Sequence, residues 1–381
     1  SGGTLINGGT LTAGNLYAFG TGAVTVGLNT FLDMANYSIA NALTNNGGTI
    51  LNGGTISGGD FTNGTTYLSG SNSTLAEVSG AATVNVSGTG ITISNVAGGT
   101  VNVNGAGTTI QSYNGGNVAV GAGLSVAMND GTSSGVISGN GEMTKNSAGT
   151  LTLSGVNTYT GGTTVADGKL VVDGSIAGST VTVNSGGTLA GSGSVGGIVL
   201  NLGGTISPGD SPGTLSVAGN ETWNAGGNYN WQIYDTTLVA GTGWDLVNAT
   251  GTLDLSALSL GSEFNVNLWS LSGIAPDVNG SALNFDPSQS YTWTILTAAS
   301  GITGFSADKF LINTGAANGT AGFANALAGG SFSMAQNGNN LDLVFTANGG
   351  TAVPEPGTWA AAALLVGGAA FLRWRKRKQV S

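Results

Sequence analysis

The N-terminal part of the chain alternates apolar and polar residues with a period of two. In these strings Val, Leu or Ile is separated by Thr or Asn, and Gly, Asn, Ser and Asp fill the intervals between strings. A period of two predicts β-strands with one buried face and one exposed face. The intervening residues favour turns, and no convincing helical period appears before about Thr214. The clearest strings are Val84-Asn85-Val86, Ile91-Thr92-Ile93, Val101-Asn102-Val103, Leu151-Thr152-Leu153 and Val181-Thr182-Val183.

These strings repeat along the chain. Thr-Val-Asn-Val begins at Thr83 and again at Thr100, and Gly-Gly-Thr begins at Gly186 and again at Gly203, 17 residues apart in each case. Imperfect repeats of very short strands are typical of a β-solenoid, in which each coil buries its apolar face against the next. Outward Thr, Asn and Ser are then expected to form polar ladders. A β-sandwich is the alternative, but the density of Gly and the scarcity of bulky side chains favour the solenoid.

One segment, Gly139 to Leu170, carries a more specific pattern. Its features are Gly139-x-Gly141, Lys145, Gly149-Thr150-Leu151-x-Leu153-x-Gly155, Asn157-x-Tyr159-x-Gly161 and Val165-x-x-Gly168. The segment resembles the autotransporter-associated β-strand repeat of bacterial surface proteins, and it departs from that repeat at Met143 and Ser147, where Leu and Gly are usual. The resemblance implies a strand-turn-strand unit of a right-handed parallel β-helix, and it implies no activity.

Composition divides the chain into three parts before a short C-terminal part, residues 351–381, which is described below. Residues 1–138 are predicted to form irregular Gly-, Thr- and Asn-rich solenoid coils, and residues 139–214 the repeat with further coils. Residues 215–350 are predicted to form a β-rich cap, because large aromatic side chains can fill a wider core and an open solenoid end needs cover. A Trp-lined sugar platform is the alternative there. Five of the seven Trp lie in this part: Trp223, Trp231, Trp244, Trp269 and Trp293.

Charge and residue content exclude several function classes. The chain has 8 Lys and Arg against 18 Asp and Glu, and all but Lys145, Lys169 and Lys309 of the basic residues lie in the last nine positions. The rest of the chain is therefore acidic, which argues against a nucleic-acid partner. His and Cys are both absent, so the common zinc, Ser-His-Asp and Cys-His sites cannot form within the chain. We predict no enzyme activity, no cofactor and no metal.

Three local motifs are candidate sites. Gly209 to Gly213 fits the Gly-x-Ser-x-Gly nucleophile pattern, but the flanking prolines and the lack of His favour a turn. Asp167 and Asp173 each precede Gly and are predicted to lie in turns rather than to act as paired acids. Asn337 to Asp342 is predicted to be a turn that feeds a strand, with calcium binding as the less favoured alternative.

The end of the chain combines prolines, an apolar run and a basic cluster. The uncharged run from Pro356 to Leu372 would span roughly 25 Å as a helix, and flanking side chains can snorkel across the remaining bilayer thickness. The positive-inside rule keeps the cluster cytoplasmic. We therefore predict a single C-terminal transmembrane helix in residues 351–381. The cluster contains Arg373, Arg375, Lys376, Arg377 and Lys378.

The residues before the apolar run complete a known tripartite arrangement. Val353, Pro354, Glu355 and Pro356, the apolar run and the basic cluster closely resemble the PEP-CTERM sorting signal of Gram-negative bacteria. The resemblance implies recognition by an exosortase, cleavage near the motif, and delivery to the cell surface or extracellular matrix. It also implies transient anchoring in the inner membrane and an association with exopolysaccharide and biofilm. A tail anchor that is never cleaved is the alternative.

This orientation requires the body of the protein to cross the inner membrane, so we expect a signal peptide upstream of Ser1. Three function classes then remain: an exported structural or adhesin-like solenoid, a polysaccharide-active β-helix lyase or hydrolase, and an autotransporter passenger. The lack of Arg, His and paired acids before the tail argues against the second class, and the predicted C-terminal helix argues against the third.

Overall fold

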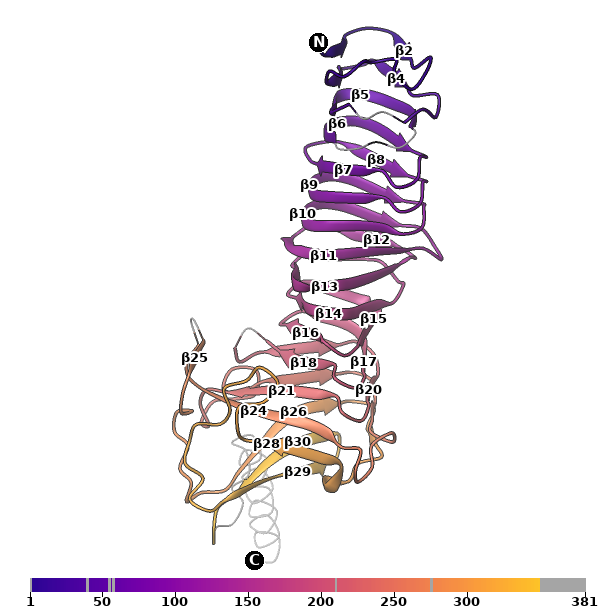
Figure 1. The fold of residues 1–381 in the computed structure, drawn as a ribbon. Helices are drawn as coiled ribbons and strands as arrows, with labels where there is room; N and C mark the ends of the chain where they lie inside the picture. The colour runs from indigo at the N-terminus through magenta and orange to yellow at the C-terminus, as the bar shows by residue number, and fades with distance from the viewer. Residues whose placement is uncertain are drawn as a thin grey trace, which may run out of the picture.

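The computed structural model describes residues 2–38, 41–53, 56, 59–209, 211–274 and 277–349. The chain forms a rod of stacked coils, with β2 near one end and β29 and β30 at the other (Figure 1). In the part that the structure describes, the single helical element is η1, a 3-10 helix at Ala307–Lys309. The prediction of an all-β solenoid is therefore confirmed.

The strands are short, and several of the longer ones bend around a corner of the coil. The strands of the rod are β1 (Thr4–Ile6), β2 (Thr10–Thr12), β3 (Val24–Val26), β4 (Phe31–Asp33), β5 (Leu43–Gly53), β6 (Gly59–Leu68), β7 (Thr74–Val78), β8 (Thr83–Val86), β9 (Thr92–Val103), β10 (Thr108–Val120), β11 (Ser125–Ser133), β12 (Ile137–Gly139), β13 (Glu142–Leu153), β14 (Thr163–Val172), β15 (Ser175–Val183), β16 (Gly187–Gly191), β17 (Ser194–Leu200), β18 (Thr205–Pro208), β19 (Thr214–Val217) and β20 (Glu221–Trp223). The remaining strands are β21 (Asn228–Ile233), β22 (Leu246–Ala249), β23 (Leu253–Asp254), β24 (Phe264–Ile274), β25 (Asp277–Asn279), β26 (Tyr291–Ala298), β27 (Ile302–Thr303), β28 (Phe310–Asn313), β29 (Ser331–Asn337) and β30 (Asn340–Thr346).

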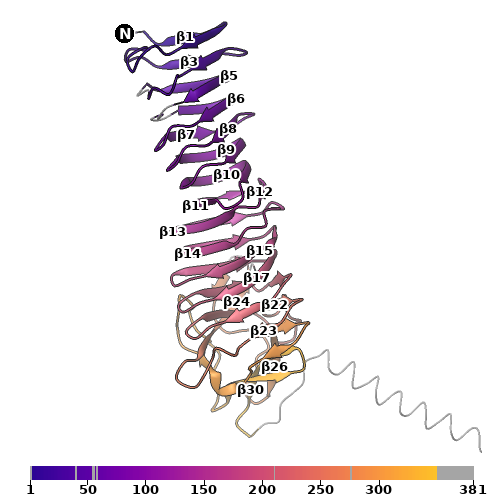
Figure 2. The same ribbon diagram turned by 90° about the vertical axis from the view of Figure 1, so that its right-hand side faces the viewer.

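Successive coils pair in parallel, strand above strand (Figure 2). β9 illustrates the arrangement, because its first part pairs with β7 and its last part pairs with β8. The next coil, in β10, pairs with both parts of β9. Backbone hydrogen bonds therefore run from coil to coil along the rod, as expected for a chain in which each unit contacts its neighbours.

The core is a column of apolar side chains from stacked positions. Val84 lies against Val101 and Val86 against Val103, and all four are fully buried. Each buried side chain of this size stabilises the fold by about 1.5–3 kcal/mol relative to exposure. Because the same two positions of the alternating string point inward in each coil, the column continues from one coil to the next.

Glycines at one corner of the coil also stack on one another. Gly116, Gly135, Gly155, Gly174 and Gly193 occupy this corner in consecutive coils. A Cβ atom on any of the last four would lie closer than 3.0 Å to the carbonyl oxygen of the glycine one coil before it. The close approach of the two backbones therefore requires Gly here, which accounts for part of the high Gly content of the chain.

Outward polar residues form ladders, as the sequence predicted. Asn102 donates a hydrogen bond from Nδ2 to Oδ1 of Asn85 at 2.9 Å, one coil away. A second ladder joins Asn224 to Asn201 at 3.0 Å and Asn201 to Asn184 at 2.9 Å. These side-chain bonds repeat the direction of the backbone pairing, so they add to the same coil-to-coil contacts.

The coils become larger beyond β19, and the core becomes aromatic. Trp223 stacks on Phe264 with ring centroids 4.4 Å apart, and Trp231 lies 5.8 Å from Trp293. Four Trp are buried, namely Trp223, Trp231, Trp244 and Trp293, whereas Trp269 is only partly buried. The interpretation of most of these Trp as core residues is confirmed.

The parallel stacking ends in a small antiparallel sheet. β26 still pairs in parallel with β22, but it pairs antiparallel with β30, which in turn pairs antiparallel with β29. These last three strands are called the terminal sheet below. The predicted boundaries at residues 138, 214 and 350, and the right-handed sense of the coil, stay predictions.

Candidate functional sites

The predicted sorting motif and basic cluster lie outside the described residues. This applies to Val353, Pro354, Glu355 and Pro356, to the apolar run that follows them, and to Arg373, Arg375, Lys376, Arg377 and Lys378. Over the ranges that the structure does describe, no helix has the length and apolar character needed to span a bilayer. The sorting signal and the transmembrane helix therefore stay predictions.

Lys145 lies inside the solenoid, at a position that apolar residues occupy in the following coils. It pairs with Val165 in the next coil, and its side chain is fully buried. Its Nζ donates to the backbone oxygen and the hydroxyl of Ser147, the latter at 2.9 Å, and to the backbone oxygen of Asp167 at 3.4 Å. Asp130 Oδ1 lies 3.8 Å from Nζ.

These contacts join three consecutive coils at one corner. Ser147 strengthens the connection, because its hydroxyl donates to Asp130 Oδ1 at 2.7 Å. Burial lowers the pKa of the Lys145 amino group, and the negative charges of Asp130 and Asp167 oppose this effect. The ammonium group thus satisfies oxygen atoms from neighbouring coils, and we interpret Lys145 as a structural connection of the repeat.

Glu221 is a carboxyl group within the apolar column. It pairs with Ile198 in the preceding coil and with Leu253 in the next, and it is fully buried. Oε2 accepts a hydrogen bond from Trp223 Nε1 at 3.0 Å, whereas no partner is found for Oε1 among the described residues. Burial raises the pKa of Glu221 to about 8, so the side chain is neutral at pH 7.

A second buried acid, Asp245, lies in the same aromatic part of the rod. Its oxygens accept hydrogen bonds from the backbone nitrogens of Gly213 at 3.0 Å and Gln232 at 2.9 Å. Burial raises its pKa despite these donors, and the negative charge of Asp277 acts in the same direction. Because Asp245 has no exposed surface and both of its oxygens accept hydrogen bonds, it connects the segment before β19 to β21.

Of the three motifs found in the sequence, Asp167 and Asp173 were both predicted to lie in turns. Asp173 lies in the bend between β14 and β15, as predicted, but Asp167 lies within β14, so the prediction is wrong for Asp167, whose strand continues past Gly168. β18 ends before Gly209 and β19 begins after Gly213, with no helix, so the predicted turn is confirmed; Asp210 lies outside the described residues. Ser211 Oγ lies within hydrogen-bond distance of Gln232 Oε1, at 2.9 Å, and of the carboxylate of Asp277.

The Asn337–Asp342 segment is a hairpin turn. β29 ends at Asn337 and β30 begins at Asn340, which confirms the predicted turn feeding a strand. Asp342 is buried within β30 and accepts a hydrogen bond from Thr294 Oγ1 at 2.8 Å, and burial raises its pKa. Within the described ranges, no group of three or more acidic side chains is arranged to hold a metal ion.

Sequence reasoning missed the buried acids. A signal for Glu221 was present, because it occupies an inward position of the alternating string Glu221-Thr222-Trp223. No comparable signal marked Asp245, whose partners Gly213 and Gln232 are 32 and 13 residues away. Its burial depends on how the segment before β19 meets β21, which the local pattern does not report.

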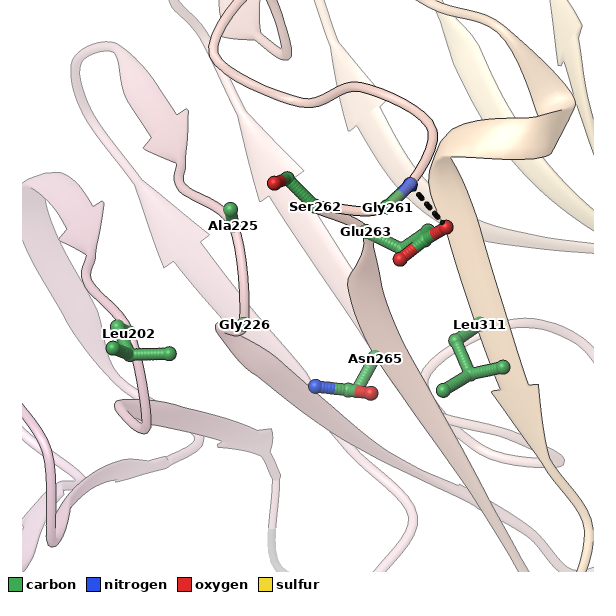
Figure 3. Close-up of a pocket in the computed structure, with 8 residues that line it drawn as sticks. All are labelled: Leu202, Ala225, Gly226, Gly261, Ser262, Glu263, Asn265 and Leu311. Atoms are coloured by element: carbon green, nitrogen blue, oxygen red, sulfur yellow. Dashed lines mark hydrogen bonds between the residues drawn. The ribbon is translucent and has the colours of Figure 1, made fainter.

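An open groove of about 470 Å³ crosses neighbouring coils in the C-terminal half (Figure 3). Leu202 and Leu311 lie at its two sides and are well exposed, and Asn265 lies between them. Glu263 Oε1 accepts a hydrogen bond from the backbone nitrogen of Gly261 at 2.7 Å. The groove holds no aromatic side chain and no basic group, so its chemistry does not define a ligand.

Comparison with known proteins bears on one part of the chain. A family model described as Passenger-associated-transport-repeat matches residues 143–172. This is the autotransporter-associated β-strand repeat that the sequence resembles, so that interpretation is confirmed for the matched segment, which includes Lys145. None of the curated proteins compared with the chain matches it.

Proposed function

We propose that the protein is an exported cell-surface or extracellular-matrix solenoid with a structural, adhesin-like role and no catalytic activity. The observation that carries the proposal is the match of residues 143–172 to a repeat associated with autotransporter passengers, set in a β-solenoid. A rod of this kind presents a long, regular outer surface, because each coil exposes the same strand faces. Lys145 and Asp245 are held by structural partners, and Glu221 is fully buried in the core, which supports a non-catalytic role.

The proposed route to the surface uses the C-terminal signal. An exosortase would recognise Val353 to Pro356, with the apolar run held in the inner membrane and the basic cluster on the cytoplasmic side. Cleavage near the motif would release the rod, and exopolysaccharide or biofilm matrix would be its surroundings. The sequence of residues 353–381 supports this part of the proposal.

The terminal sheet is proposed to act as a cap of the solenoid. Its antiparallel pairing interrupts the parallel stacking, so a further coil has no parallel partner strand there. A covered end limits edge-to-edge association of rods, which is the usual hazard of exposed strand edges. The support is the change in strand direction between β26 and β30.

Intact mass spectrometry of the protein from native cells tests the route. The expected result is a surface or matrix form that lacks the residues beyond the motif, and a variant with Pro354→Ala and Pro356→Ala that keeps them. Recovery of the uncleaved wild-type chain from the matrix would refute processing by an exosortase. Assay of neutral and acidic polysaccharides for new reducing or unsaturated ends tests the absence of catalysis.

A further inference from the structure

We propose that the outward face formed by β4, β5, β6, β8 and β9 binds a neutral polysaccharide chain. The proposal rests on the extracellular role proposed above and adds the site and the chemical class of the ligand. Two parallel ranks of side chains make up this face, which is called the polar sheet face below. One rank contains Phe31, Thr49 and Thr83, and the other contains Tyr67, Asn85 and Asn102.

Two aromatic rings are exposed on this face although the solenoid has an apolar interior. Phe31 is 42% exposed and Tyr67 is 47% exposed, whereas their neighbours Leu32 and Leu68 point inward and are fully buried. A Phe ring on the outer face of a strand contributes nothing to the core. It does offer a flat apolar surface on which the C–H face of a sugar ring can pack, as aromatic side chains do at interfaces.

The spacing of the two rings follows from the pairing register. Phe31 pairs with Thr49, and Thr49 pairs with Thr65, which lies two residues before Tyr67 on the same side of β6. The rings are therefore two coils apart, or about 10 Å along the rod at ~4.8 Å per strand. Because the rings lie in different ranks, about 7 Å apart across the rod at ~3.3 Å per residue, an extended glycan that runs obliquely to the rod axis can contact both rings with sugars of the same chain.

Polar groups continue the face beyond the rings at the same regular interval. Tyr67 pairs with Asn85, and Asn85 pairs with Asn102. The hydrogen bond from the side-chain amide of Asn102 to that of Asn85 fixes the orientation of both side chains. Thr83 lies beside them in the first rank. Oriented amides and hydroxyls that recur with every coil match a polymer whose hydroxyls also recur at a fixed interval, and they suit a single small molecule less well.

Charge selects a neutral polymer. The chain has no Lys or Arg before Lys145, so an anionic polysaccharide has no cation to pair with on this part of the rod. The acidic character of the protein would also repel it. The strands of this face contain two acidic residues, Asp33 and Asp60. Asp33 lies on the same side of β4 as Phe31, and Asp60 lies in the first part of β6, where it pairs with Glu77 of β7.

Pull-down of the full chain tests the proposal. The probes are microcrystalline cellulose and soluble dextran as neutral polymers and polygalacturonate as an anionic polymer. A double variant, Phe31→Ala with Tyr67→Ala, is compared with a control, Leu202→Ala with Leu260→Ala, whose side chains are 71% and 78% exposed elsewhere on the rod. Circular dichroism and sedimentation velocity establish that each variant is folded and report its oligomeric state.

The expected result is retention of the wild type and the control by at least one neutral probe. The double variant should bind about tenfold more weakly, which corresponds to the loss of two ring contacts. Retention by neither neutral probe, equal retention of the double variant, or equal retention by polygalacturonate would overturn the proposal. The proposal would also be overturned if sedimentation velocity showed that the wild type is a dimer and that the double variant alone is a monomer, because the rings would then form a contact between two copies of the chain. If native cells still display the protein, such a result removes this inference and leaves the proposed function standing.

Discussion

Replacing Glu221 with Gln should change how the stability of the rod depends on pH. In the folded protein, burial raises the pKa of this carboxyl from an ordinary value of 4.5 to about 8. The group is then neutral in both states below pH 4.5, and it favours neither state. Between pH 4.5 and pH 8 the unfolded chain ionises while the folded chain does not, so the free energy of unfolding falls as the pH rises. Above pH 8 the loss is complete.

The size of the effect follows from the shift. Each pKa unit corresponds to 1.36 kcal/mol, so a shift from 4.5 to about 8 corresponds to a loss of about 5 kcal/mol at most. Gln has a similar shape and keeps an oxygen that can accept the bond from Trp223 Nε1, but it does not ionise. Wild type and variant should therefore be of similar stability at pH 4, and the variant should be more stable by several kcal/mol at pH 8.5.

The assay is equilibrium unfolding in urea from pH 4 to pH 9, followed by Trp fluorescence. Trp223 lies next to Glu221 and reports on this end of the rod, which matters because a solenoid need not unfold in one step. Glu142→Gln, at an exposed position of β13, is the matched control and should follow the wild-type curve. Parallel curves for Glu221→Gln and wild type over the whole range would refute the argument that burial keeps this carboxyl neutral.

Three further predictions concern contacts between coils. Gly161→Ala should destabilise the rod by about 1–3 kcal/mol, because its Cβ would lie closer than 3.0 Å to a carbonyl oxygen of the preceding coil. Gly162→Ala is the control and should be neutral, because its Cβ would meet its nearest atom at 3.9 Å. Equal unfolding midpoints of the two variants in urea would contradict this prediction. Lys145→Met should lower the free energy of unfolding by about 1–3 kcal/mol, because it leaves buried oxygens without a donor. Lys169→Met, at an exposed position, is the control and should have little effect. Thermal unfolding checks the difference, and an unchanged melting temperature of Lys145→Met would count against the role of Lys145 as a structural connection. Asn201→Ala should lower the free energy of unfolding by about 1–2 kcal/mol, because it removes two ladder hydrogen bonds. The expected sign is faster amide hydrogen exchange confined to the adjoining coils. Unchanged exchange there would show that the ladder does not contribute to stability.

The architecture of the rod was predictable because its contacts are local in sequence. The string from Thr83 to Val86 recurs from Thr100 to Val103, and the structure pairs the two residue by residue. Alternation identifies which side chains point inward, and repetition identifies what they pack against. The burial of four Trp was predictable for a different reason, because aromatic side chains of that size can fill a core wider than the column of the first coils.

The details of the larger coils were not predictable. Alternation places Glu221 inward, yet its residue type suggests solvent, and only the stacking of Ile198 and Leu253 on either side shows that it is buried. Asp245 is held by backbone groups of Gly213 and Gln232, which belong to different coils. Loop length decides which of these groups meet, and the local pattern contains no information about it.

By itself the sequence determined that the chain is β-structured, that its strands stack in coils, and that Val, Leu and Ile form the column. The physical reason is that the apolar side chains alternate with a period of two and the strings recur once per coil. Stacking the coils in parallel then buries the apolar side chains and pairs the backbone at the same time. The tertiary structure alone decided which corners bring two backbones too close for any residue but Gly, and which acids lose contact with water. Both depend on how closely neighbouring coils approach one another, which the local sequence pattern does not report.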